Sequence, residues 1–396
     1  MWHGNSGGAM VPIPSEREGV KLAHGGRPGA RRARSATRTI KQVGALVALG
    51  IGALLLSGCD ARTAMRFGWP AGVTPEAEKM GDLWTWSVIA ALLMGILVWA
   101  LIFWTITFHR AKAGKDEFPR QTAYNVPLEL GYTAIPFVII AVLFYFTVIV
   151  QNDVESKTSD PKVVVDVTAF QWNWKFGYRN VEFTDGARYN GFESSGSPFE
   201  LQARNMRTEH GEEHPVLGPA GGRDDDIRNY LKFNQIETVG SSSEIPILVL
   251  PTGKRIEFDI ASADVIHSFW VPEFLFKRDV MPFPKQNHSD SVFQISSIDR
   301  EGAFVGRCAE MCGTFHSMMN FEVRAVSQQK FDAYIKYREG NPQATNAQAL
   351  EAICEVPKSV TTVPFDTRRA TGGDTPTNLG DANNTNLQNC TVGANG

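Results

Sequence analysis

Two thiols, an imidazole and a thioether lie within one short stretch of this 396-residue sequence. They are Cys308, Cys312, His316 and Met319, in the spacing C-x3-C-x3-H-x2-M. A second imidazole, His267, follows an upstream run that predicts a strand. Cysteine and histidine at such short spacing are typical of metal sites, and zinc is a common occupant. A disulfide between the two cysteines, or a set of unrelated core residues, would be the simpler explanation.

The mixture of donors favours copper over zinc, because thiolate, thioether and imidazole together suit copper. A single blue-copper ion would use His267, one cysteine, His316 and Met319, and would leave the other thiolate without a role. Two bridging thiolates with two terminal imidazoles suit two copper ions that share charge. Each ion then needs one weak further ligand, which Met319 and a backbone carbonyl of the loop can supply. This closed ligand set predicts electron transfer, since hydrolysis requires an open coordination position.

The elements that must hold these ligands are short alternating segments, which predict an all-β sandwich or Greek-key barrel over residues 153–345. Strands are predicted at 162–168, 245–250, 255–260, 291–296, 303–307 and 320–326, and a closing helix at 331–338. Residues 191–244 interrupt this rhythm with ten acidic and five basic side chains. We interpret them as a solvated surface insertion, with an acidic docking face as the alternative. Residues 346–396 form a tail that is predicted to be largely disordered.

Two runs without formal charge precede the β region: 26 residues between Asp82 and His109, and 23 between Glu129 and Asp153. Each is longer than the about 20 apolar residues that cross a bilayer, so a transmembrane hairpin is predicted over 83–152. The loop between the runs is rich in Lys and Arg, and such loops stay in the cytoplasm. The linker 59–82 and the β domain are therefore expected on the outer face of a bacterial cell membrane. The net charge of −3 argues against a nucleic-acid partner.

The composition of the N-terminus is typical of a targeting segment. A basic stretch and an apolar run of 14 residues predict a signal peptide of the lipoprotein type over 1–58, with an N-terminal extension. The run ends in the letters LSGC, which resemble a lipobox and predict a membrane lipid on Cys59; an incidental cysteine is the alternative. The last two cysteines, Cys354 and Cys390, are also expected outside the cell, where a disulfide between them can form.

Glu129 has two explanations from the sequence. Asn125, Pro127 and Glu129 together are typical of a helix start, with a capping side chain, a first-turn proline and a carboxylate at the positive helix end. The alternative is a carboxylate at which protons enter, because ionisable groups near membrane spans often mark ion pathways.

With these motifs, residues 81–338 resemble subunit II of haem–copper cytochrome c oxidase. The family signature C-x-E-x-C-G-x-x-H-x-x-M is met throughout from Cys308 to Met319. The resemblance implies a membrane-anchored, cupredoxin-like domain with a binuclear CuA copper centre. The implied ligands are His267, Cys308, Glu310 (through its carbonyl oxygen), Cys312, His316 and Met319. In the family the Glu310 side chain also binds a magnesium ion shared with subunit I.

Three further segments are similar to family features. Residues 170–174 (FQWNW) resemble the aromatic patch where electrons from cytochrome c enter, which implies that role for Trp172. Glu129, in E-x-x-x-T-x-I-P, resembles the carboxylate at the mouth of the K proton path, and this favours the proton role over capping alone. Residues 277–279 (KRD) also fit, although Pro282 and Phe283 stand where the family usually has Pro-Gly.

The resemblance implies that the chain passes electrons from cytochrome c through CuA to haem a of subunit I. Haem a3 and CuB of that subunit then reduce oxygen with proton pumping, and subunit III is a further partner. The sequences of these motifs are most similar to those of actinobacterial aa3-type oxidases, in which the electron donor is a c-type haem subunit of a bc1 complex. Three alternatives remain. A quinol-oxidase subunit II is a scaffold that lacks the copper ligands, and another kind of CuA protein would lack the membrane hairpin. A copper-delivery protein would expose its ligands.

Overall fold

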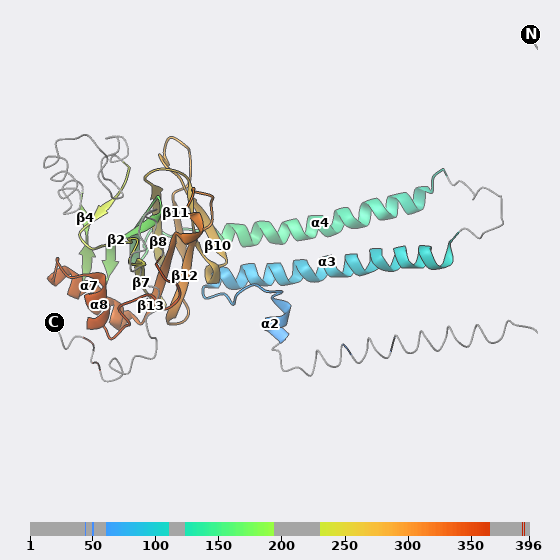
Figure 1. Cartoon of the computed structure of the whole chain (residues 1–396). Helices are drawn as coiled ribbons and strands as arrows, with labels where there is room; N and C mark the ends of the chain where they lie inside the picture. Colours follow the sequence, from blue (N-terminus) through green and yellow to red (C-terminus); the bar gives the residue numbers. More distant parts are fainter. Residues whose placement is uncertain are drawn as a thin grey trace, which may run out of the picture. The chain divides into compact units, whose positions relative to one another are not determined.

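The computed structural model describes residues 44, 50, 61–110, 123–193, 230–364, 390 and 392. The predicted lipidation residue Cys59, and almost all of the predicted signal peptide, lie outside these residues. From Arg62 onward the chain forms one compact unit. A short helix, α2 (Ala61–Met65), leads into two long helices, α3 (Pro75–Phe108) and α4 (Val126–Val154), which lie side by side (Figure 1).

Both long helices begin at capping residues that the sequence provides. The Thr74 side chain accepts a hydrogen bond from the Ala77 amide at the start of α3, and the Asn125 side chain accepts one from the Leu128 amide at the start of α4. Each helix is long and apolar enough to cross a membrane, and the side chains of its most apolar window are not buried inside the protein. The two long apolar helices of the predicted hairpin are therefore present, although α3 starts well before residue 83 because its cap lies on Thr74.

The β domain is built from two sheets of mixed direction. One has the order β11-β8-β1-β2-β3 with β6 beside β2, and the other has the order β10-β9-β12-β13-β7. Pairing is parallel between β1 and β8 and between β7 and β13, and antiparallel elsewhere. The strands are β1 (Val163–Phe170), β2 (Asn173–Glu182), β3 (Arg188–Asn190), β6 (Glu237–Val239), β7 (Ile247–Pro251), β8 (Ile256–Ser262), β9 (His267–Val271), β10 (Phe276–Val280), β11 (Val292–Ile295), β12 (Gly302–Cys308) and β13 (Asn320–Val326).

Aromatic side chains of the two sheets meet in one core. Trp174 of β2 contacts Phe269 of β9 and Phe321 of β13, with ring centroids 6.0 and 5.2 Å apart. Phe258 of β8 contacts Phe269 at 5.5 Å. All four side chains are buried, so the sheets pack face to face as a sandwich. The predicted fold class, a two-helix hairpin followed by a cupredoxin-like sandwich, is confirmed.

The structure differs from the sequence-based domain limits in two places. Helix α7 (Gln328–Gly340) is followed by α8 (Asn346–Ala352), inside the segment that composition assigned to a disordered tail. A capping box between Thr345 and Gln348 and the burial of Leu350 stabilise this short helix. The ends of the predicted insertion are also structured, as strands β4 (Phe192–Glu193), β5 (Phe233–Asn234) and β6. Residues 194–229 lie outside the described part.

Candidate metal centre

The predicted ligands come from two strands and the loop between β12 and β13. His267 is the first residue of β9, and Cys308 is the last residue of β12. Cys312 lies in the turn that follows, and His316 begins the 3-10 helix η2 (His316–Met318). Met319 stands between η2 and β13. Strand β12 pairs with both β9 and β13, which brings the upstream histidine to the loop.

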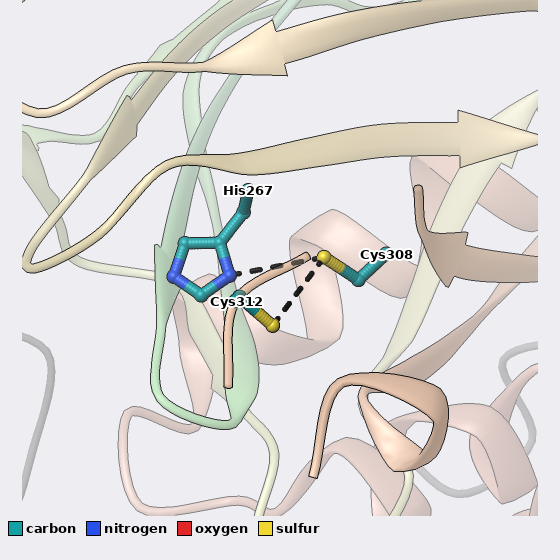
Figure 2. A group of neighbouring side chains, drawn as sticks. All are labelled: His267, Cys308 and Cys312. Carbon is teal, nitrogen blue, oxygen red and sulfur yellow. Dashed lines mark hydrogen bonds between the residues drawn. The ribbon is translucent and has the colours of Figure 1, made fainter. Parts of the chain in front are cut away.

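The donor atoms of these residues face one another. Cys308 Sγ lies 3.8 Å from Cys312 Sγ and 3.8 Å from His267 Nδ1 (Figure 2). On the other side of the pair, Cys312 Sγ lies 3.5 Å from His316 Nδ1 and 3.9 Å from Met319 Sδ. Both thiols are free, so the disulfide alternative is not what this structure contains. Each sulfur thus has its own imidazole, and the two sulfurs lie between the two rings.

The donor set fits a pair of copper ions better than one zinc ion. His267, Cys308, Cys312 and Met319 are all buried, and the carbonyl oxygen of Glu310 lies 3.2 Å from Cys308 Sγ. Two thiols, two imidazoles, a thioether and a carbonyl make six donors, whereas a tetrahedral zinc site uses four. Soft sulfur donors combined with imidazole suit copper. The arrangement is therefore compatible with the predicted pair of copper ions.

The contact between the two thiols moves their pKa values apart. The hydrogen bond between the two thiols lowers the pKa of Cys308 to about 3, although burial opposes this shift. The same contact raises the pKa of Cys312 above its usual range. One thiolate is thus formed before a metal arrives, and the second thiol must lose its proton on binding.

Asp264 orients the ring of His267. Its Oδ1 lies 2.8 Å from His267 Nε2 and accepts the Val265 amide at 2.7 Å, while its Oδ2 accepts the Gln171 amide at 2.7 Å. Burial disfavours a charged imidazole, but Asp264 and the Cys308 thiol outweigh it and raise the pKa of His267. When Nε2 carries the hydrogen, the lone pair of Nδ1 faces Cys308 Sγ, as a metal ligand requires. Nothing in the sequence marked this carboxylate, although it precedes the candidate ligand His267 by only three positions.

Gln171 and Trp172 hold the ligand loop by one carbonyl group. Gln171 Nε2 and Trp172 Nε1 donate to the Cys312 oxygen at 2.8 and 3.1 Å. The half-buried Trp172 ring also meets Phe315 edge-on, with centroids 5.0 Å apart. Gly313 follows with a φ of +117°, and a Cβ there would lie 3.2 Å from the Trp172 ring, so the turn requires glycine. The sequence singled out Trp172 and missed its neighbour in the same FQWNW segment.

The other residues singled out by the sequence belong to other parts of the chain. Glu129 lies in the first turn of α4, where its Oε1 accepts the Asn125 amide at 2.9 Å. This contact is the one expected for helix capping. It does not test the predicted role in proton entry, which stays a proposal. Cys354 and Cys390 form a disulfide, which attaches the C-terminal segment to the end of α8.

Two membrane-compatible helices, a β-sandwich and a buried thiolate–imidazole–thioether site define a membrane-anchored copper protein of electron transport. The family model for the periplasmic domain of cytochrome c oxidase subunit II matches residues 232–326. A probable cytochrome c oxidase subunit 2 of Nocardia farcinica is 60% identical over 365 residues, which cover 89% of this chain and 96% of the relative. Cytochrome c oxidase subunit 2 of Mycobacterium tuberculosis is 54% identical over 333 residues, or 84% and 91% of the two chains. The chain therefore belongs to the cytochrome c oxidase subunit 2 family, as its motifs indicated.

A solved structure, the periplasmic domain of subunit II of cytochrome oxidase from Bradyrhizobium japonicum, covers 46% of this chain and 98% of its own. It shares 20% sequence identity, with a TM-score of 0.27, and at this level the likeness adds nothing to the sequence relatives. Membership of the family makes the chain one subunit of an oxidoreductase that is anchored in a membrane and assembles with other oxidase subunits.

Proposed function

We propose that this chain receives electrons from a c-type cytochrome at Trp172 and passes them to haem a in subunit I of an aa3-type oxidase. One observation carries the proposal: the hydrogen bond of 3.1 Å from Trp172 Nε1 to the carbonyl oxygen of the ligand Cys312. This contact joins a half-buried indole at the surface directly to the metal-binding loop. The indole and the donor atoms therefore form one continuous route from the surface into the site.

A binuclear CuA centre held by the six donors would supply a one-electron store whose two ions share the charge. The residues of this chain provide its surroundings. Four of the donor residues are buried, which limits the access of water; Asp264 fixes the tautomer of His267, and Gln171 holds the Cys312 carbonyl group. Ligands that are positioned before the metal binds need little rearrangement, and this supports a role in fast electron transfer.

The surface beside Trp172 supports a protein donor. Val265 and Ile266, which directly precede His267, are 38% and 39% exposed, and Met311 in the ligand loop is 73% exposed. Exposed apolar side chains that gather around a site are typical of protein–protein contacts. A donor that docks on this surface would bring its haem edge close to the indole.

The test uses the complete oxidase with Trp172→Phe, which keeps an aromatic ring and removes the N–H donor. We expect slower single-turnover electron uptake from a reduced c-type cytochrome, with an unchanged copper content. The paramagnetic resonance spectrum should still show one unpaired electron shared by two copper nuclei. Trp86→Phe, at an exposed position of α3, is the matched control. Equal uptake rates in the two variants, or a spectrum of a single copper nucleus, would refute the proposal.

The proposal extends to further roles, of which the lipid on Cys59 and the orientation rest on local sequence patterns and the others on family resemblance. The Glu310 side chain binds magnesium together with subunit I, and Glu129 accepts protons at the mouth of the K path. Cys59 carries a lipid, which together with the basic loop places the β-sandwich on the outer face of the membrane. The donor is the c-type haem subunit of a bc1 complex, and subunit III completes the assembly.

A further inference from the structure

The segment just before α3 is fastened to the β-sandwich by backbone hydrogen bonds on both sides. The Val73 amide donates to the carbonyl oxygen of Glu273 at 3.0 Å, and the Asp299 amide donates to the carbonyl oxygen of Val73 at 2.9 Å. Val73 and Thr74 are 1% and 0% exposed. The start of the first membrane helix is therefore inserted between two loops of the exported domain.

Glu76 adds a side-chain contact to this attachment. It lies in the first turn of α3 and is only 6% exposed. Its Oε1 accepts both the amide and the hydroxyl of Ser296, at 2.9 and 2.5 Å, and Arg255 Nη2 donates to that hydroxyl at 2.8 Å. Glu78, two positions later in the same turn, is exposed. A buried carboxylate with two donors on a distant loop indicates a specific contact, because burying a carboxylate without such partners is costly.

The attachment lies on the same chain segment as the metal ligands. Glu273 belongs to the 3-10 helix η1 (Pro272–Phe274), which directly continues β9, and β9 begins with His267. Strand β12, which ends with Cys308, packs against η1, and α3 packs against it as well. A hydrogen-bonded path of short, regular elements therefore runs from α3 to two of the ligands.

From this geometry we propose that Glu76 is a positioning residue for electron transfer. Its contact with Ser296 fixes the sandwich on α3, and so fixes the metal centre relative to the membrane helices. The inference rests on the proposed function, in which the electron acceptor is a haem of the membrane subunit. Electron transfer depends steeply on the separation of the two centres, so a looser attachment lowers the rate without changing the metal site itself.

The first measurement is hydrogen exchange on the copper-free full-length chain in detergent, with Glu76→Gln and with Glu78→Gln as the matched control. A neutral amide in place of the carboxylate weakens two charge-assisted hydrogen bonds. We expect exchange at the Val73 and Ser296 amides to become about tenfold faster in E76Q and to stay at the wild-type rate in E78Q. Unchanged exchange in E76Q would overturn the proposal.

The second measurement is copper-to-haem electron transfer in the complete oxidase after rapid photoreduction of the copper centre. E76Q should transfer more slowly than E78Q, while its paramagnetic resonance spectrum and its KM for the cytochrome stay at wild-type values. A merely structural role would lower the yield of assembled enzyme and leave the transfer rate of the surviving molecules unchanged, and that result would overturn the proposal.

Ser296→Ala keeps the carboxylate and one of its two donors, so it should slow transfer less than E76Q does. It also serves as the test variant if E76Q does not assemble, and a wild-type transfer rate in it would then count against the proposal. If the wild-type oxidase itself passed no electrons from copper to haem, the proposed function would fail. The exchange measurement would then decide by itself whether Glu76 fixes the domain on the helix.

Discussion

Replacing Asp264 by Asn should weaken copper binding without unfolding the domain. The carboxylate uses both oxygens: Oδ1 faces His267 Nε2 and the Val265 amide, and Oδ2 accepts the Gln171 amide. An Asn side chain has one acceptor oxygen, so it can serve one of these two sides, and its NH2 group faces a donor on the other. In either orientation the imidazole loses an ionised partner.

The expected size follows from these contacts. A hydrogen bond to a charged group contributes about 1.5–3 kcal/mol, against about 0.5–1.5 kcal/mol for a neutral one. At about 1.4 kcal/mol per factor of ten, the difference corresponds to about tenfold in binding. Loss of the carboxylate behind a metal-binding histidine typically lowers metal affinity about 10–100-fold. We therefore expect Asp264→Asn to lower the copper affinity about 10–100-fold.

The assay is a competition between the protein and a chelator of known copper affinity, followed by optical and paramagnetic resonance spectra of the loaded protein. Asp299→Asn is the matched control, because the Asp299 side chain accepts a hydrogen bond from Ser297 on the exposed surface. Urea unfolding of the copper-free proteins checks that the fold is intact. A wild-type copper affinity in the Asp264 variant, with a normal fold, would refute the reasoning that this carboxylate fixes the ligand tautomer.

Two further predictions concern stability, measured by urea unfolding of the copper-free chain. Arg179→Met should cost about 3–5 kcal/mol, because it leaves the buried carboxylate of Asp166 without its counter-charge; Arg188→Met, at a largely exposed ion pair, should cost about 0–1 kcal/mol. Burial already raises the pKa of Asp166, so keeping this carboxylate ionised at higher pH lowers the free energy of unfolding. The stability loss caused by Arg179→Met should therefore become smaller as the pH falls through the pKa of Asp166, where the carboxylate becomes neutral. Reducing the Cys354–Cys390 disulfide, which closes a separation of 36 residues, should cost about 3–4 kcal/mol.

The outcomes that would contradict these two predictions are distinct. Equal stability losses in the Arg179 and Arg188 variants would mean that the burial of Asp166 does not matter. For the disulfide, the double Cys-to-Ser variant should be as unstable as the reduced protein and should not respond to dithiothreitol. A reductant effect that persists in the double variant would come from the remaining cysteines of the chain, which are Cys59, Cys308 and Cys312.

The candidate ligands, whose donor atoms the fold brings together, could be singled out in the sequence because their chemistry is local. Five of the six, all except His267, lie in the segment from Cys308 to Met319, and the set of donors itself favours copper over zinc. Asp264 and Gln171 could not be found in the same way. Their role arises only when the fold brings the end of β1 against the segment before β9, and nothing in their own spacing predicts that contact.

The strand β2 was missed for a related reason. Its segment contains Lys175 and Arg179, which suggest an exposed loop, yet Lys175 is 1% exposed because its Nζ binds Glu237 Oε1 at 2.7 Å. The partner lies in β6, at the far end of the insertion. A buried charge depends on a distant counter-charge, so local alternation of apolar and polar residues does not indicate it. The strands β1, β8 and β13 were placed to within about two residues. Although β1 and β13 also bury charged side chains (Asp166, Glu322 and Arg324), their runs of β-branched or alternating apolar residues are long enough to indicate a strand.

The two parallel strand pairs have a consequence for how the domain folds. Strand β1 pairs with β8, on the other side of the whole insertion, and β7 pairs with β13, near the end of the sandwich. Contacts between such distant segments form slowly, since the intervening chain must first be closed into a loop. Neither sheet is complete before its later partner strand has been made. We therefore expect the candidate metal site to be among the last parts of the domain to form, so that copper would bind a nearly finished domain.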